Sequence, residues 1–161
     1  MIKEVTGDIL LSKAQALAHG VAPNDDFKNG LAMALRESYP SLYKDFRHYS
    51  HGSHPKEGTI WTWQSAEGKK FFNLFTQEHA KSHSSHPGKA KINYVNHALK
   101  DLRKSIDKEG IASIALPKIA TGVGGLDWEE VKPLIEKHLG DLDIPVYIYS
   151  TYQKDVEGKE D

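Results

Sequence analysis

The chain has 161 residues, of which 39% are hydrophobic and 27% charged, a size and composition that fit one folded domain. Its 21 Lys and Arg residues nearly balance its 22 Asp and Glu residues, so net charge favours direct binding of neither nucleic acid nor an anionic membrane. There is no cysteine, which excludes disulfides, thiolate nucleophiles and cysteine-ligated zinc.

Short runs rich in Val, Ile, Phe, Tyr and Trp, bounded by Gly, Pro or Asp, predict six strands along the chain. In chain order they are Ile2–Thr6, Ala14–His19, Gly58–Gln64, Lys70–Thr76, Ile111–Leu116 and Ile144–Tyr149. The first run begins almost at the N-terminus, without a signal peptide, and no apolar run approaches the roughly 20 residues that cross a bilayer. We therefore expect a cytoplasmic protein without a membrane partner.

Helices are predicted between these strands. One runs over Asn29–Tyr39, because Pro40 disfavours helical geometry before it, and a short one follows over Ser41–Tyr49. Apolar residues recur every three or four positions in Lys89–Lys108, which predicts an amphipathic helix. The last helix is expected as a single turn capped by the side chain of Asp127, then a main helix over Lys132–Leu139, because Pro133 interrupts the pattern.

Alternating strands and helices predict a three-layer α/β/α domain with a mixed, mostly parallel sheet of about six strands. We assign residues 1–153 to this domain and residues 154–161 to a mobile polar tail. Ligands of such folds bind beyond the carboxyl ends of the strands, where loops lead into helices. The loops at that edge are therefore the places to look for a site.

A glycine-rich segment follows the fifth predicted strand and reads Thr121, Gly122, Val123, Gly124, Gly125, Leu126. A loop with few side chains can turn its amides toward phosphate oxygens, and a following helix adds a partial positive charge. The alternative is a tight strand-to-helix turn without a ligand. The segment matches neither the P-loop nor the dinucleotide-binding pattern.

A second loop leaves the strand at His19 and enters a helix through Asn29, Gly30 and Leu31. Two facing loops lined by amides can hold both charged centres of a pyrophosphate. At the end of the first strand, Asp8 is placed to accept a proton of an adenine amino group. Its alternative role is that of a turn aspartate bonded to its own backbone.

Four motifs, taken in order, resemble the macrodomain family: Gly7 to Leu10, Leu17 to His19, Asn29 to Ala32, and Leu116–Pro117 with Thr121 to Trp128. The resemblance spans nearly the whole chain. It is nearest to three branches, namely the terminal ADP-ribose protein glycohydrolase, the macrodomain antitoxin that removes ADP-ribose from DNA, and the macrodomain-type ADP-ribose-1″-phosphate phosphatase.

The resemblance implies a binding site for ADP-ribose. Asp8 would contact the adenine amino group and Ile9 the ring nitrogens, with Tyr152 on the adenosine side. The loop from Thr121 to Leu126 would wrap the diphosphate, and Asn29, Gly30 and Leu31 would contact the diphosphate and the distal ribose. The expected partner is ADP-ribose or an ADP-ribosylated macromolecule, and a modified nucleic acid remains open as substrate despite the balanced charge.

The chain departs from the two glycohydrolase branches at their catalytic positions. Their lysine aligns with Gln77 and their aspartate with Gly124, so a covalent lysyl adduct is not expected. Removal of ADP-ribose from a target would then depend on an oriented water, with His19, Asp25, Asp26 and Gln77 as candidate catalytic residues. The alternatives are an ADP-ribose-1″-phosphate phosphatase, suggested by His19, and a non-catalytic ADP-ribose reader.

Two groups of histidines raise the possibility of a metal site, His48, His51 and His54, and His79, His83 and His86. Both lie among Ser, Lys and Pro residues, as solvated surface does, so we predict neither a metal nor a cofactor. Trp61 and Trp63 lie two residues apart on one face of a strand and are expected to pack under a helix.

Overall fold

The structure is a computed structural model that describes residues 1–81 and 87–161. Its six strands and four α-helices follow the predicted order, with strand ends displaced by up to three residues from the sequence-based bounds. In chain order the elements are β1 (Ile2–Gly7), the 3₁₀ turn η1 (Ile9–Leu11), β2 (Ala16–Val21), α1 (Gly30–Ser38), α2 (Pro40–Ser53), β3 (Ile60–Gln64), β4 (Lys70–Phe75), α3 (Ile92–Glu109), β5 (Ile114–Pro117), α4 (Trp128–Leu139) and β6 (Val146–Tyr152).

The six strands form one mixed sheet in the order β1-β6-β5-β2-β4-β3. Each neighbouring pair is parallel except β3 and β4, which form an antiparallel hairpin at one edge. After β2 the chain continues to the β3–β4 side of the sheet, and after β5 it continues to β6 on the other side. The loops that follow β2 and β5 therefore leave the same edge of the sheet side by side, where ligands of α/β folds bind.

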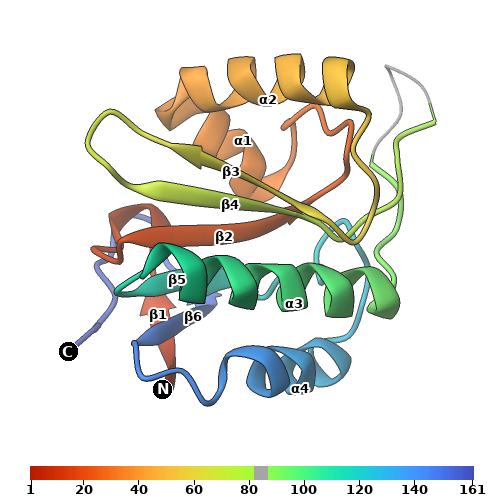
Figure 1. The fold of residues 1–161 in the computed structure, drawn as a ribbon. Coiled ribbons are helices and arrows are strands. Elements are labelled where there is room, and N and C mark those ends of the chain that lie inside the picture. Colours follow the sequence, from red (N-terminus) through yellow and green to blue (C-terminus); the bar gives the residue numbers. More distant parts are fainter. Residues whose placement is uncertain (82–86) are drawn as a thin grey trace.

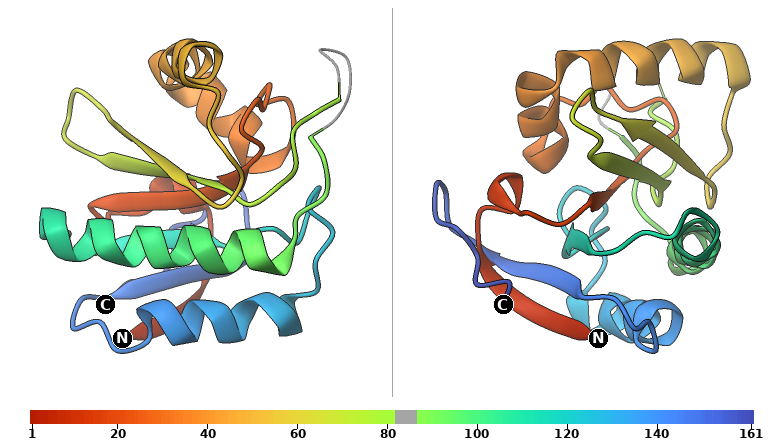
Figure 2. Two further views of the ribbon diagram at one scale, coloured as in Figure 1. Left: turned by 45° about the vertical axis from the view of Figure 1, so that its right-hand side comes forward. Right: turned by 60° about the vertical axis from the view of Figure 1, so that its left-hand side comes forward.

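Helices cover both faces of the sheet, which confirms the predicted three layers (Figures 1 and 2). On one face α3 and α4 pack over a core that includes Leu74, Leu99 and Ile148. On the other face α1 and α2 pack over a core that includes Leu17, Phe46 and the half-buried Trp61. Trp61 stacks on Tyr49 with ring centroids 5.2 Å apart, so the tryptophans of β3 pack under a helix as predicted.

Two helices are longer than predicted. Pro40 is not a linker between two helices but the first residue of α2. At that position a backbone N–H would have no partner within the helix, so the absence of this group in proline does not destabilise the helix. The helix continues past Tyr49 to Ser53, because buried Ser50 donates its hydroxyl to the carbonyl of Pro23, 2.6 Å away. The prediction of a short helix ending at Tyr49 was therefore wrong.

The prediction of a separate turn before α4 was also wrong, since one helix runs through Pro133. Pro133 has no N–H to donate to the carbonyl of Glu129, four residues earlier. Glu129 is exposed, so water can donate to this carbonyl instead. Asp127 is the N-cap, as expected, but its side chain makes no capping bond; its backbone carbonyl accepts from the amides of Glu130 and Val131 instead.

Residues 154–161 return along β1 and η1. The amide of Asp8 donates to the carbonyl of Val156, and the amide of Asp155 donates to Asp8 Oδ2 at 3.0 Å. The half-buried Glu160 accepts from the hydroxyl of Ser12 and from the hydroxyl of Tyr149. Most of the segment is exposed, and its run of charged residues does not predict these contacts with the domain.

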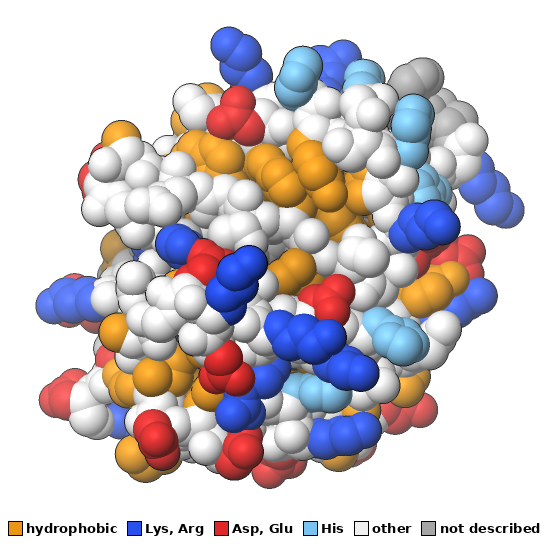
Figure 3. Space-filling model, in the orientation of Figure 1, with side chains coloured by type: hydrophobic (Ala, Val, Ile, Leu, Met, Phe, Trp, Pro, Cys, Tyr) orange, Lys and Arg blue, Asp and Glu red, His pale blue; other side chains and the backbone are white. Residues whose placement is uncertain are grey.

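Charged side chains are distributed unevenly on the surface. Figure 3 shows Lys, Arg and His side chains along the upper edge of the molecule, where α2 lies, and a mixture of both signs over α3 and α4. Within residues 1–81 and 87–161 no helix is both long and apolar enough to cross a membrane.

Candidate functional site

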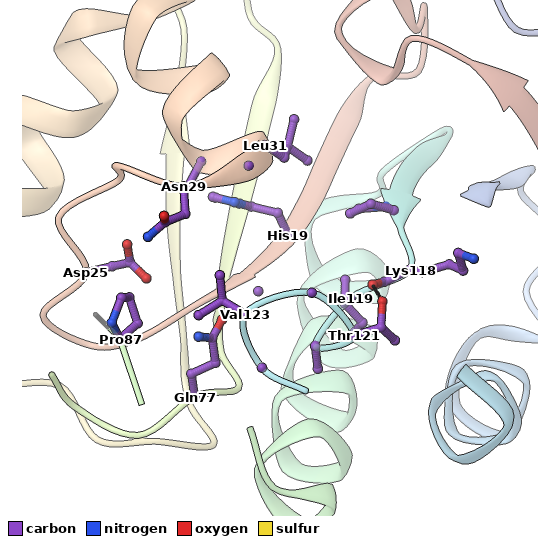
Figure 4. Close-up of a pocket in the computed structure, with 17 residues that line it drawn as sticks. His19, Asp25, Asn29, Leu31, Gln77, Pro87, Lys118, Ile119, Thr121 and Val123 are labelled. Atoms are coloured by element: carbon purple, nitrogen blue, oxygen red, sulfur yellow. Dashed lines mark hydrogen bonds between the residues drawn. The ribbon is translucent and has the colours of Figure 1, made fainter. Parts of the chain in front are cut away.

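A cavity of about 270 Å³ opens at the carboxyl ends of β2 and β5, and we call it the central cavity (Figure 4). Four segments that lie far apart in the chain line it. They are His19 and Gly20 of β2, the following loop with Asp25 and residues 29–32, Gln77 after β4 together with Pro87, and the segment 117–124 after β5. The arrangement brings the two loops singled out in the sequence to face one another.

The segment after β5 lines this cavity with backbone whose amides find no partner among the described residues. Among the described residues, no backbone carbonyl accepts a hydrogen bond from the amides of residues 120–124, although the amides of Gly125 and Leu126 turn back to Gly122 and Ala120. Ala120 adopts a left-handed conformation, with φ of 64°, which bends the chain around the cavity. A concave run of free amides is the arrangement that binds phosphate oxygens.

The start of α1 contributes a second set of donors. The first helical amides, from Gly30 onward, have no carbonyl one turn earlier to accept from them, and the side chain of the N-cap Asn29 does not cap them. These amides and the helix dipole favour an anion at this end of the helix. In Figure 4 the side chain of Asn29 extends from the helix start toward the space near Asp25. The central cavity is thus lined by anion-binding groups on two sides.

A second, mainly apolar cavity of about 390 Å³ adjoins the first, and we call it the apolar cavity. It shares Gly30, Leu31 and Pro117 with the central cavity, so the two form one elongated groove. Its remaining lining comes from the end of β1, η1, α1 and the end of β6, namely Gly7, Asp8, Ile9, Leu10, Ala34, Tyr149 and Tyr152.

Asp8 lies at the edge of the apolar cavity and is almost completely buried. Its Oδ1 accepts from the amide of Leu10 at 3.0 Å, which is the local turn role considered as the alternative for this residue. Its Oδ2 accepts from the amide of Asp155 at 3.0 Å. A carboxylate has about four acceptor positions, so Asp8 can hold the backbone and still accept from a ligand.

His19 lies in the floor of the central cavity and is buried. Its Nε2 lies 2.7 Å from Asn73 Oδ1, and the ring of Phe27 meets it edge-on with centroids 5.7 Å apart. Burial lowers the pKa of His19 to about 4, although the bond with Asn73 acts in the opposite direction. The imidazole is therefore neutral at pH 7 and acts through hydrogen bonds rather than as a cation.

Phe27 lies in the loop that leads from β2 to α1. It has a left-handed backbone, with φ of 53°, and a completely buried ring packed on Phe46 and Tyr43. A non-glycine residue in this conformation costs about 1 kcal/mol or more, which the buried aromatic contacts offset. Phe27 thus packs against His19 without lining the groove.

Asp25 lies where the central cavity meets the next depression on the surface. Its carboxylate accepts from the amides of Ala22 and Phe27, each at 2.9 Å. Burial raises the pKa of Asp25 to about 6, against these two bonds, and the charge of Asp26 adds to the rise. Asp25 is still mostly ionised at pH 7 and is the acidic side chain among the described lining of the central cavity.

Two other candidate catalytic residues are placed differently. Asp26 does not line the central cavity; its Oδ1 accepts from the amide of Lys28, and the residue faces the adjoining depression. Gln77 does line the central cavity, but its Nε2 donates to the carbonyl of Gly88 at 3.0 Å. Of the four candidates, the structure therefore brings His19, Asp25 and Gln77 together and leaves Asp26 outside, because its carboxylate turns back to its own loop.

The packing around Gly124 leaves no room for a side chain. A side chain at Gly124 would begin 2.6 Å from the carbonyl oxygen of Ala120 and 2.9 Å from Cβ of Ala90. An aspartate would not fit without movement of the loop. Gln77 and Gly124 are therefore consistent with one another, since neither partner of a lysine and aspartate pair is present.

Most predicted ligand-binding residues line the groove, but Gly125 and Leu126 do not. They turn away because their amides bond back to the loop, with Leu126 donating to Ala120 at 3.0 Å. The central cavity is also lined by Lys118, Ile119 and Ala120, which were not predicted from the sequence. Their place directly after the strand, before the first glycine, is the signal that would have identified them.

The two histidine groups do not form a metal site within the part of the chain that the structure describes. His48 and His51 are exposed on α2, and His54 follows its end. His79 pairs with Glu57, Nδ1 to Oε2 at 3.0 Å. His83 and His86 lie outside the described residues.

The chain is similar in sequence to a family profile and to several known proteins. A profile described as "Macro domain" matches residues 75–135. The DNA ADP-ribosyl glycohydrolase of Thermus aquaticus is 29% identical over 153 residues, 92% of this chain, and the chain spans 41% of that relative's length. The ADP-ribose 1″-phosphate phosphatase of Lodderomyces elongisporus is 24% identical over 162 residues, covering 91% of this chain and 98% of the phosphatase.

The fold is shared with a solved structure described as Thermosipho africanus DarTG in complex with ADP-ribose. That structure has a TM-score of 0.80 and 26% identity, covering 97% of this chain and 42% of its own. The matched profile, the relatives and the common fold agree with the resemblance carried by the four sequence motifs. In profile, sequence and fold, this chain is similar to macrodomains.

Proposed function

We propose that this protein binds ADP-ribose along the groove and removes it from a modified target. The observation that carries the proposal is the run of free amides at residues 120–124, which faces the start of α1 across the central cavity. Two sets of donors suit a diphosphate. The apolar cavity with Asp8, Ile9 and Tyr152 would then take the adenosine, which leaves the distal ribose near His19, Asp25 and Asn29.

The chemistry proposed is attack of water on the anomeric carbon of the distal ribose. The bond to the water oxygen forms as the bond from this carbon to the target breaks, and the target leaves with the electron pair and takes up a proton from solvent. Asp25 would orient this water and accept its proton, since its raised pKa makes it a stronger base than an ordinary aspartate while leaving it ionised at neutral pH. His19, neutral and held by Asn73, would hydrogen-bond the ribose or the water. The resemblance aligns a catalytic lysine with Gln77 and a catalytic aspartate with Gly124. Because neither residue is present here, the proposed reaction has no covalent lysyl intermediate.

The target proposed is DNA, because the T. aquaticus relative is named a DNA ADP-ribosyl glycohydrolase and matches almost all of this chain. Phosphate removal from ADP-ribose-1″-phosphate is the second candidate. It is favoured by a phosphatase relative whose whole length the chain covers and by the imidazole of His19 in the cavity floor. The proposal keeps the cytoplasmic setting expected from the sequence.

The first experiment is a calorimetric titration with ADP-ribose. Micromolar binding, about −8 kcal/mol, is expected for the wild-type protein. Asp8→Asn, which retains an oxygen for the backbone amide of Leu10, should weaken binding while circular dichroism remains unchanged. Absence of binding at millimolar ligand would contradict the proposed groove.

The second experiment measures products. Free ADP-ribose released from an ADP-ribosylated oligonucleotide supports the hydrolase, and phosphate released from ADP-ribose-1″-phosphate supports the phosphatase. Asp25→Asn should abolish release but preserve ADP-ribose affinity. If both substrates remain intact while ADP-ribose binds, the protein is a reader rather than an enzyme.

A further inference from the structure

Two more depressions run along α2, outside the groove described above. One, of about 640 Å³, lies between the loop after β2 and α2, and the other, of about 690 Å³, lies along α2 itself. Both are lined by Arg36, Tyr43, Arg47 and His51, so they are parts of one surface feature. We call this feature the α2 trough, lined also by Lys28, Lys44, His48 and Lys81.

The α2 trough continues the ADP-ribose groove. The apolar cavity leads into the central cavity through Gly30 and Leu31, and the central cavity leads into the trough through Asp25 and Pro87, which line both. If adenosine occupies the apolar cavity, the distal ribose points toward Asp25. The bond between ADP-ribose and its target would therefore lie at the entrance of the trough.

The trough is positively charged. Its lining carries five basic side chains, at Lys28, Arg36, Lys44, Arg47 and Lys81, and three acidic ones, at Asp25, Asp26 and Asp45. Asp45 is already engaged, since its Oδ2 accepts from the indole of Trp63 at 2.7 Å, and Asp25 accepts from two backbone amides. The cations are mostly exposed, as Figure 3 shows over α2, so they can meet an anion.

An aromatic platform accompanies these charges. The guanidinium of Arg36 lies over the ring of Tyr43, 4.1 Å from its centroid, and both border the two halves of the trough. Lys44, Arg47 and His51 follow one another at helical spacing on α2, a span of about 10 Å. Such a surface is longer than one phosphate and offers a planar group for stacking.

We propose that the α2 trough binds the strand of nucleic acid that carries the ADP-ribose group. This inference rests on the proposed hydrolase function and adds a second binding site to it. The cations of the trough would bind the phosphodiesters, and a base would stack on the Arg36–Tyr43 pair. Single strands are bound in general by a basic groove combined with aromatic stacking. An acidic peptide would use the cations but gain nothing from the planar pair, which is why we favour nucleic acid.

The test uses fluorescence anisotropy with an unmodified, labelled single-stranded oligonucleotide. Lys44→Gln/Arg47→Gln removes two charges from the trough, and Lys100→Gln/Lys104→Gln, on the exposed side of α3, removes two charges elsewhere. The first variant should bind about tenfold more weakly. Its slope of log affinity against log salt should decrease by about 1.4, or about 0.7 for each phosphate that is no longer neutralised, while the α3 variant behaves as the wild type.

Calorimetry with ADP-ribose separates this proposal from the previous one. Both variants should bind ADP-ribose with wild-type affinity, because none of the four residues lines the groove. Equal oligonucleotide binding by the two variants, or a poly-glutamate peptide competing as well as the oligonucleotide, would overturn the proposal. Failure of the wild type to bind ADP-ribose would refute the proposed function and leave the oligonucleotide measurement interpretable.

Discussion

His19 of β2 and Asn73 of β4 are direct neighbours in the sheet, and their side chains meet with 2.7 Å between Nε2 and Oδ1. Asn73 also donates to the carbonyl of Trp61 at 3.1 Å, so one buried amide connects the cavity floor to the edge strand. This contact fixes the orientation of the imidazole beneath the ligand groove. It also makes His19 sensitive to substitutions that do not touch the cavity.

Asn73→Leu should destabilise the protein by about 1–3 kcal/mol, because His19 Nε2 is left buried without a partner. The pKa of His19 should fall further, since the bond that this variant removes is the one that raises it. Chemical denaturation and NMR titration of the imidazole measure the two effects. Asn96→Leu is the matched control, because Asn96 makes the same 2.7 Å bond to the less buried His138. Equal destabilisation of both variants would contradict the role of burial.

Asp25 and His19 should affect stability with opposite dependence on pH. The pKa of Asp25 is raised from 3.8 to about 6, so the folded state binds its proton more tightly and stability falls as pH rises from 4 to 6. The pKa of His19 is lowered from 6.5 to about 4, so the unfolded state binds its proton more tightly and stability rises from pH 4 to 6.5. The two contributions, each on the order of 3 kcal/mol, should largely cancel in the wild type.

Single variants should reveal this cancellation. The stability of Asp25→Asn relative to wild type should increase between pH 4 and 6, and that of His19→Gln relative to wild type should decrease over a similar interval. Denaturant unfolding at half-unit pH steps measures both differences. Parallel curves for all three proteins would show that neither group is perturbed by burial.

Gly124→Ala should disturb the phosphate loop. The added Cβ would meet the carbonyl oxygen of Ala120 at 2.6 Å, so the amides of residues 120–124 must shift and ADP-ribose affinity should drop tenfold or more, about 1.4 kcal/mol. Gly122→Ala is the control, because a Cβ there has no atom within 4 Å. Calorimetry measures the ADP-ribose affinity of both variants. An equal loss of affinity in Gly122→Ala would mean that every glycine of the loop is required, rather than Gly124 in particular.

Glu160→Ala should loosen the returning C-terminal segment. The carboxylate of Glu160 accepts from the hydroxyl of Ser12, the amide of Lys13 and the hydroxyl of Tyr149. The variant loses these three bonds between the segment and the domain. Faster hydrogen exchange at the amide of Asp155 is expected, together with weaker ADP-ribose binding, because that amide helps to hold Asp8. Unchanged exchange at Asp155 would show that the segment is held by its backbone bonds alone.

The order of strands and helices, the three layers and the two loops of the groove could be predicted from the sequence. These features depend on local patterns, such as the helical spacing in α3 and the glycines after β5, which one segment carries by itself. The helix through Pro133 and the side-chain capping bond of Asp127 were mispredicted, because solvent exposure and backbone bonding, rather than residue type, decided them.

The sequence by itself determined the resemblance to macrodomains, because the four motifs follow one another along the chain and can be recognised without the fold. Tertiary structure alone decided the state of the site. The burial that shifts the pKa values of His19 and Asp25, the exclusion of a side chain at Gly124 and the separation of Asp26 from the cavity all result from packing between distant segments. The basic α2 trough is likewise a result of the tertiary structure. The chain has a balanced net charge, and a basic surface forms only when folding brings α1, α2 and their neighbouring loops together.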